Sequence, residues 1–320
     1  METENKIDQL KQLKSIFSDL KSEIGQIVVG QEEAIEHLLL SIFCNSHCLL
    51  VGVPGLAKTL MINTLSKSLG LSFNRIQFTP DLMPSDIVGS EILNKNKEFE
   101  FIKGPIFSNI ILADEINRTP PKTQAALLEA MQEKMVTSNG NTFSLGKLFF
   151  VLATQNPIEQ EGTYPLPEAQ LDRFMFQINL TYPSFEDEIE IVKRTTGNSN
   201  TQIKSILSEK DIIMFQSVIR EMPVADNVLH YAVNLVQSTR TGEFANNDFA
   251  KEYIAWGAGP RASQNLILAA KANAALHGKF SPDIEDVKAV TRPILQHRVI
   301  LNYKAKAKNI TFDDLIKTLS

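Results

Sequence analysis

Residues 52–59 read GVPGLAKT, and this stretch decides the fold. It lies between an apolar run at 47–51 (HCLLV) and a segment with helical spacing at 59–69. The arrangement resembles the P-loop pattern G-x-x-x-x-G-K-[ST], which joins a strand to a helix. Glycines let backbone N–H groups close around phosphate oxygens, and the start of the helix adds its positive dipole. The stretch therefore predicts a phosphate-binding loop formed by Gly52, Val53, Pro54, Gly55, Leu56, Ala57, Lys58 and Thr59.

Three positions of this loop carry separate expectations. Lys58 is expected to reach the β- and γ-phosphates of ATP, and the Thr59 hydroxyl is expected to hold Mg²⁺. Ala57 stands where the general pattern has glycine. A methyl group is tolerated there if φ is negative, which a starting helix would provide. The alternative, a Gly/Pro turn that happens to precede Lys-Thr, is disfavoured because a strand and a helix flank the loop.

The same order of apolar run, polar turn and helix occurs again further on. Residues 109–113 (NIILA) lead into Asp114-Glu115 and a helix at 122–133, and residues 148–154 (LFFVLAT) end at Gln155-Asn156-Pro157. Continuous apolar strands that alternate with helices are typical of a parallel sheet covered on both faces. We therefore predict an α/β domain with three layers.

Two acids and an amide at these strand ends could complete an ATP-hydrolysing site. Asp114 is expected to bind Mg²⁺ through water, and Glu115 to polarise the attacking water as a general base. Asn156 is expected to orient that water or to touch the γ-phosphate. Alone, an acidic pair after a strand is usually a solvated strand end and Asn-Pro is a turn signal. The P-loop about 60 residues upstream favours the functional interpretation.

Beyond residue 183 the pattern becomes helical with polar connections. We predict an α/β domain over residues 1–183 and a smaller all-α domain over 184–320, in which Ser281-Pro282 opens a helix. Two arginines are candidates for phosphate contacts. Arg173 resembles an arginine finger, or else forms an ion pair with Asp172 at a helix end. Arg261 lies at a helix start, where a cation opposes the helix dipole unless it has a phosphate partner or simply faces solvent.

Composition limits the partners and the cellular compartment that can be expected for this chain. The chain has 320 residues, a formal charge of −5 and a pI of about 5.7, which disfavours nucleic acid as the default partner. Residues 1–25 carry charges throughout and do not resemble a secretory signal, and no apolar run is long enough to insert into a membrane. Cys44 and Cys48 have no second pair to complete a metal site, so we expect two semi-buried thiols in a reducing cytosol.

Together and in this order, the motifs resemble those of AAA+ ATPases and in particular the MoxR family. The resemblance extends over about residues 25–300 and is carried by residues 29–31 (VGQ), 52–59, 78–86 (FTPDLMPSD), 114–121 (DEINRTPP), 153–157 (ATQNP), 171–174 (LDRF) and 257–261 (GAGPR). It implies an AAA+ core followed by an all-α lid. It further implies that Lys58 and Thr59 belong to Walker A, Asp114 and Glu115 to Walker B, Asn156 is sensor 1, Arg173 the finger, Arg261 sensor 2, and Val29 and Gly30 part of an adenine pocket.

The resemblance also implies a biological context. MoxR-like proteins act as chaperones in protein maturation or metal-cofactor loading. We accordingly expect an ATP- and Mg²⁺-dependent ring, a hexamer, and the composition described above favours the cytoplasm. Their partners are protein clients and often proteins with a von Willebrand factor A domain. Hairpins are expected at 91–101, with polar residues 94–97 at the tip, and at 135–145, which contains Asn139-Gly140. They would correspond to inserts that face the ring pore, or else decorate the edge of a sheet. The competing functions are the ATPase subunit of a metal chelatase, a nucleic-acid motor, and a nucleotide-gated scaffold; the acidic balance disfavours the motor.

Overall fold

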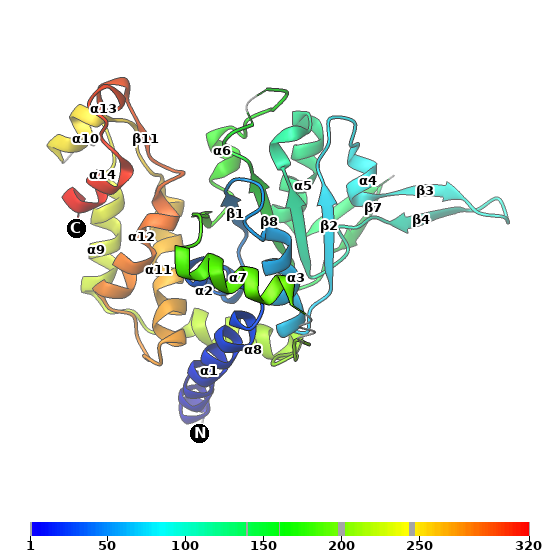
Figure 1. Ribbon diagram of the computed structural model, residues 1–320, viewed down its shortest axis with the longest axis horizontal. Helices are drawn as coiled ribbons and strands as arrows, with labels where there is room; N and C mark the ends of the chain where they lie inside the picture. Colours follow the sequence, from blue (N-terminus) through cyan, green and yellow to red (C-terminus); the bar gives the residue numbers. More distant parts are fainter. Residues whose placement is uncertain (1, 139, 160, 198–201, 243–246, 320) are drawn as a thin grey trace. The chain divides into compact units, whose positions relative to one another are not determined.

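The computed structural model describes residues 2–138, 140–159, 161–197, 202–242 and 247–319 (Figure 1). It divides into two compact units. The helical unit comprises Met1–Phe17, Met175–Gln177 and Met214–Ser320, and the sheet unit comprises Ser18–Phe174 and Ile178–Ile213. The domain boundary expected near residue 183 stays a prediction.

A five-stranded sheet is the centre of the sheet unit. Its strands are β1 (Cys48–Val51), β2 (Phe73–Gln77), β5 (Ile110–Asp114), β8 (Phe150–Gln155) and β9 (Phe176–Asn179), in the order β2-β5-β8-β1-β9. The pairs β2/β5, β5/β8 and β1/β8 are parallel. Successive residues of β1, β5 and β8 are buried although they point to opposite faces, so both faces are covered. This confirms the predicted α/β class and its parallel sheet.

Several helices cover and connect the sheet. They are α1 (Glu2–Gly25), which contributes to both units, α2 (Glu32–Phe43), α3 (Lys58–Ser68), α4 (Pro84–Val88), η1 (Ile116–Arg118), α5 (Pro121–Glu133), α6 (Glu168–Leu171) and α7 (Phe185–Thr196). Helix α1 has an apolar stripe that is buried at Leu10, Leu13, Phe17 and Leu20. The helices predicted at 59–69 and 122–133 correspond to α3 and α5, so helical spacing in the sequence indicated these two elements.

Both predicted hairpins are present. Strand β3 (Gly89–Leu93) pairs antiparallel with β4 (Phe99–Lys103), and in Figure 1 this hairpin projects away from the sheet. Strand β6 (Met135–Ser138) pairs with β7 (Asn141–Ser144). At the turn of the second hairpin Gly140 has φ +82°, as a tight turn requires, while Asn139 lies outside the described residues.

The helical unit contains α9 (Asp226–Gln237), α10 (Asp248–Tyr253), α11 (Pro260–Leu276), α12 (Ile284–Leu295), α13 (Tyr303–Ala307) and α14 (Phe312–Leu319), with α8 (Glu209–Glu221) entering it. Buried alanines of α11 face α12 and let the two helices pack closely. Two short strands, β10 (Ile254–Trp256) and β11 (Ile300–Leu301), pair antiparallel and were not predicted. Strands this short show no alternation in the sequence.

The predicted start of α12 was wrong. Ser281-Pro282 does not open this helix; it begins at Ile284 after Asp283. The Asp283 carboxylate accepts the Asp286 N–H at 3.0 Å, and the Asp286 carboxylate accepts the Asp283 N–H at 2.9 Å. This reciprocal capping box is stronger than a lone serine cap, and the Ser281 hydroxyl instead donates to the Pro223 carbonyl. Within the described residues, no helix is long and apolar enough to cross a membrane.

Candidate functional site

One cavity collects most of the predicted site residues at the carboxyl ends of β1, β5 and β8. Parallel strands end at the same edge of their sheet, which is where α/β proteins bind ligands. The cavity has a volume of about 370 Å³, within the usual range for a small-molecule site. Its lining residues are Pro54, Gly55, Ala57, Lys58, Thr59, Leu60, Asp114, Glu115 and Asn156.

The loop backbone differs from our expectation at Ala57. Its φ is +53°, in the left-handed region, whereas a negative φ was predicted. The reason is that α3 begins at Lys58, so Ala57 lies just outside the helix and does not adopt the helical φ that was assumed for it. An L-residue in this region costs about 1–2 kcal/mol. Gly55 also has a positive φ of +88°, and a Cβ there would meet no atom within 4 Å, so its backbone is open to a ligand.

Lys58 is folded back on its own loop. Its ammonium group donates a hydrogen bond to the Gly52 carbonyl. Partial burial lowers the pKa of Lys58, while the nearby carboxylates of Asp114, Glu115 and Glu159 act in the opposite direction. A half-buried cation surrounded by loop backbone is suited to bind an anion, because phosphate oxygens would offer it stronger acceptors than a carbonyl.

Asp114 is held by two side chains that the sequence analysis did not identify. The Thr154 hydroxyl donates to Asp114 Oδ1 at 2.6 Å, and the same hydroxyl accepts the Glu115 N–H at 2.8 Å. Arg75 donates to Asp114 Oδ2 through two nitrogens, at 2.7 and 3.1 Å. A cation therefore already neutralises the carboxylate that is expected to serve Mg²⁺.

Glu115 is fixed in a similar way. Its Oε2 accepts hydrogen bonds from Gln77 Nε2 at 2.8 Å and from Arg118 at 3.0 Å. The carboxylate in turn raises the pKa of Arg118. Glu115 has φ +58°, so it occupies the left-handed region like Ala57. Non-glycine residues in this region are uncommon and cluster at functional sites.

Asn156 lies at the edge of this cavity and is nearly buried, with 6% of its surface exposed. Its Oδ1 accepts the Ile158 N–H at 3.2 Å, which orients the amide. Val29 and Gly30 do not line the cavity. Gly30 has φ +73°, and a Cβ there would lie 2.9 Å from Asp187 Oδ2, so this segment is closely packed against the start of α7.

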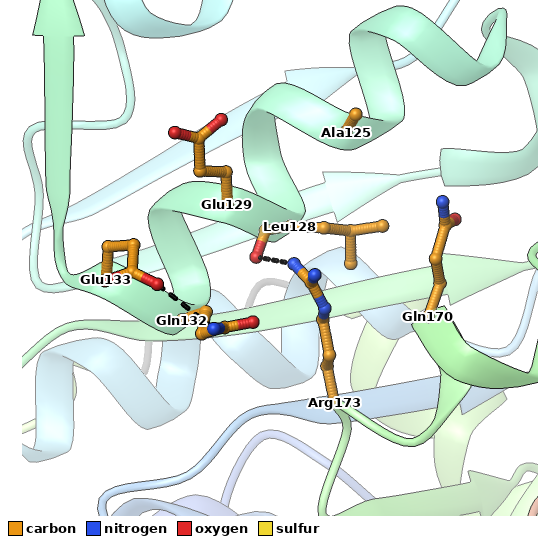
Figure 2. A pocket seen from close by; sticks show the side chains of 7 residues that line it. All are labelled: Ala125, Leu128, Glu129, Gln132, Glu133, Gln170 and Arg173. Atoms are coloured by element: carbon orange, nitrogen blue, oxygen red, sulfur yellow. Dashed lines mark hydrogen bonds between the residues drawn. The ribbon is translucent and has the colours of Figure 1, made fainter.

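The structure separates Arg173 from the P-loop cavity. Arg173 lines another pocket, of about 250 Å³, with Ala125, Leu128, Glu129, Gln132, Glu133 and Gln170 (Figure 2). Its guanidinium donates to the Leu128 carbonyl at 2.6 Å. Arg261 belongs to the helical unit, where it is the second residue of α11, as predicted.

The donor set fits Mg²⁺ bound with a nucleotide. Mg²⁺ prefers oxygen ligands and keeps several waters, so the Thr59 hydroxyl and the Asp114 carboxylate are sufficient protein donors. In the described part of the chain, no group of three or more His, Cys, Asp or Glu forms a self-sufficient metal site. Cys44 and Cys48 are fully rather than partly buried, and burial raises both thiol pKa values. These thiols are structural.

Comparison with known proteins identifies the family. A model of the ATPase family associated with various cellular activities (AAA) matches residues 47–176, and an AAA lid domain model matches residues 247–319. The chain is 45% identical over 290 residues to Chaperone MoxR1 of Mycobacterium tuberculosis, an alignment that covers 90% of this chain and 77% of the relative. The chain belongs to the MoxR family of AAA+ ATPases.

The chain is also similar to a second relative and to a solved structure. Protein YeaC of Bacillus subtilis, which is uncharacterised, is 40% identical, with 96% of this chain and 94% of the relative aligned. A crystal structure of a candidate ATPase from Cytophaga hutchinsonii superposes with a TM-score of 0.91 at 45% identity, covering 100% of this chain and 97% of that one. The fold predicted for this MoxR-family chain, an AAA+ core followed by a lid, is therefore confirmed.

Proposed function

We propose that this chain hydrolyses ATP with Mg²⁺ and uses the energy to remodel or assemble protein clients in the cytoplasm, including the loading of metal cofactors. The observation that carries the ATPase assignment is the single cavity that holds the P-loop, the Asp114-Glu115 pair and Asn156. The relative named a chaperone supports the class of biological role.

In this proposal each residue of the cavity has one task. Lys58 and the loop N–H groups bind the phosphates, while Thr59 and Asp114 hold the cation. Glu115 takes a proton from the attacking water, and Asn156 orients that water. Bound Mg²⁺·ATP supplies the γ-phosphoryl group and a charge that neutralises its oxygens. For Glu115 to act, its carboxylate must exchange a hydrogen bond from Gln77 or Arg118 for one from water.

The proposed active form is a ring, a hexamer with head-to-tail contacts, because one chain does not bring all the parts of the site to one place. Arg173 lines a pocket separate from the P-loop cavity, so we assign it to the ATP site of a neighbouring subunit. We further assign Arg261 to nucleotide sensing and Val29 and Gly30 to the adenine pocket. Proteins with a von Willebrand factor A domain are the proposed partners.

The test of this proposal mixes two inactive variants. Glu115→Gln lacks the base and Arg173→Ala lacks the finger, so each alone should bind ATP and lose turnover. In a mixed ring some interfaces pair an intact base with an intact finger, and activity should partly return. Mixed rings that stay inactive, or normal hydrolysis by Arg173→Ala alone, would contradict the shared site.

A further inference from the structure

The side chain of Gln124 on α5 makes an unusual set of contacts inside the sheet unit. It is buried, with 1% of its surface exposed. Its amide nitrogen lies 3.2 Å from the Ile116 carbonyl, 3.1 Å from the Thr119 carbonyl and 2.9 Å from the Tyr164 carbonyl. The two N–H groups of this nitrogen are shared among the three carbonyls, and the amide oxygen is buried with no hydrogen-bond partner among the described residues. The contacts of the nitrogen alone therefore hold the side chain in place.

The three carbonyls belong to two segments with different tasks in the proposed mechanism. Residues 116–119, here called the base loop, follow Glu115 directly. Residues 164–173, here called the finger segment, end at Arg173. The two segments also bond to each other, because the Tyr164 N–H donates to the Asn117 carbonyl at 2.7 Å. Gln124 therefore lies where the base loop and the finger segment meet.

The finger segment returns to the same helix at its other end. Arg173 donates to the carbonyl of Leu128, which is four residues and so one turn beyond Gln124 on α5 (Figure 2). The helix itself is anchored to the sheet, since the His47 ring lies 3.0 Å from the Met131 carbonyl near the end of α5 and also bonds Val151 of β8. Helix α5 thus contacts both ends of the finger segment, at Tyr164 and at Arg173.

We propose that Gln124 is a positioning residue that sets the base loop of its own ATP site and the finger segment that serves the neighbouring site. The inference rests on the proposed roles of Glu115 and Arg173. One amide bonds both segments, so a shift of the base loop also shifts the finger segment of the same subunit. That finger segment serves the ATP site of the neighbouring subunit. Gln124 and α5 in this way couple adjacent ATP sites of the ring.

Gln124→Met tests the positioning role, because methionine has a similar length and cannot donate to the carbonyls. Gln124 is not among the residues that line the P-loop cavity, so the affinity for ATP should stay within about twofold. The value of kcat should fall at least about tenfold, because small misplacements of reacting groups slow the reaction by such factors. The matched control is Thr123→Val. Thr123 is equally buried on the same helix, but its hydroxyl donates to the Leu82 carbonyl, outside both segments. Equal kcat losses in the two variants would overturn the proposal, because they would reflect general destabilisation.

Mixed rings test whether both segments depend on Gln124. In rings that mix Gln124→Met with Glu115→Gln subunits, only the Gln124→Met subunits carry the base. In rings that mix Gln124→Met with Arg173→Ala subunits, only the Gln124→Met subunits carry the finger. We expect neither mixture to recover activity. Recovery in either would show that Gln124 serves one segment alone and would overturn the proposal. The mixture of Glu115→Gln with Arg173→Ala is the reference: if this pair fails in mixed rings, the shared-site function is wrong rather than the role of Gln124.

Amide hydrogen exchange gives a measurement that does not depend on ring formation. In Gln124→Met, protection should fall both in the base loop and in the finger segment, while residues 52–60 exchange as in the wild type. The milder Gln124→Asn, which keeps the amide but shortens its reach, should show the same pattern and serves if the methionine variant does not fold. Loss of protection in one segment only, or in neither, would contradict the proposal.

Discussion

The buried imidazole of His47 predicts a specific loss of stability in mild acid. His47 Nδ1 accepts the Val151 N–H at 3.0 Å, and Nε2 lies 3.0 Å from the Met131 carbonyl, which requires a proton on Nε2. A second proton, on Nδ1, would remove the acceptor of the Val151 N–H and place two N–H groups against each other. Burial lowers the pKa of His47 from 6.5 to about 4, with the Met131 hydrogen bond partly opposing this effect.

The magnitude follows from the difference between the two states. The unfolded chain takes up a proton at His47 as the pH falls through 6.5, but the folded chain does so near 4. The stability that the neutral ring allows is therefore complete above pH 6.5 and is lost as the pH falls from 6.5 to 4. At about 1.4 kcal/mol per pKa unit the full loss is about 3 kcal/mol, of which about 2 kcal/mol has occurred by about pH 5.

Urea unfolding at pH 7 and pH 5 measures this loss. His47→Gln removes the titrating ring, so its free energy of unfolding should decrease less between the two pH values than that of the wild type, by about 2 kcal/mol. His230→Gln, at an exposed position of α9, is the control and should follow the wild type. The reasoning is refuted if the His47→Gln and wild-type proteins lose the same stability. The His47 ring bonds the Met131 carbonyl near the end of α5. The same measurement therefore also reports on the anchoring of the helix that carries Gln124.

Three further predictions concern nucleotide and metal. Lys58→Ala should abolish tight ATP binding, since the phosphates lose a direct cation; an unchanged affinity in calorimetry would count against the P-loop assignment. Arg261→Ala should weaken the preference for ATP over ADP, and a wild-type ratio of the two dissociation constants would exclude a sensing role. Arg75→Gln frees Asp114 of a half-exposed ion pair worth about 1 kcal/mol, so the Mg²⁺ concentration needed for tight ATP binding should fall about fivefold. A higher Mg²⁺ requirement would show instead that Arg75 supports the metal site.

The parts of the site that could be predicted are those whose residues lie close together along the chain. The P-loop, the Asp114-Glu115 pair and Asn156 each follow an apolar strand, and parallel strands place such ends at one edge. Their meeting in one cavity could therefore be expected from the pattern alone. The helices and the two hairpins were predictable for the same reason, since their signals lie within a few residues of each other.

What the sequence could not predict depends on neighbours distant along the chain. Arg75 and Gln77 reach the acidic pair because β2 lies beside β5 with Gln77 opposite Asp114, and neither strand order nor register can be read from the motifs. Their spacing by two residues, on one face of a strand, was the available signal. Ala57 was misjudged because the first residue of α3 decides its φ, and helix ends are poorly specified by sequence.

The base assignment of Glu115 is the central claim and can be tested in one comparison. Glu115→Gln preserves the shape of the side chain and removes its basicity, while Lys58, Thr59 and the loop N–H groups are unchanged. Phosphate release and ATP affinity should be measured on the same preparations of wild-type and variant protein with Mg²⁺. The account predicts that ATP binds the variant as it binds the wild type while turnover falls by about 10²-fold or more. Near-normal phosphate release by Glu115→Gln would contradict it.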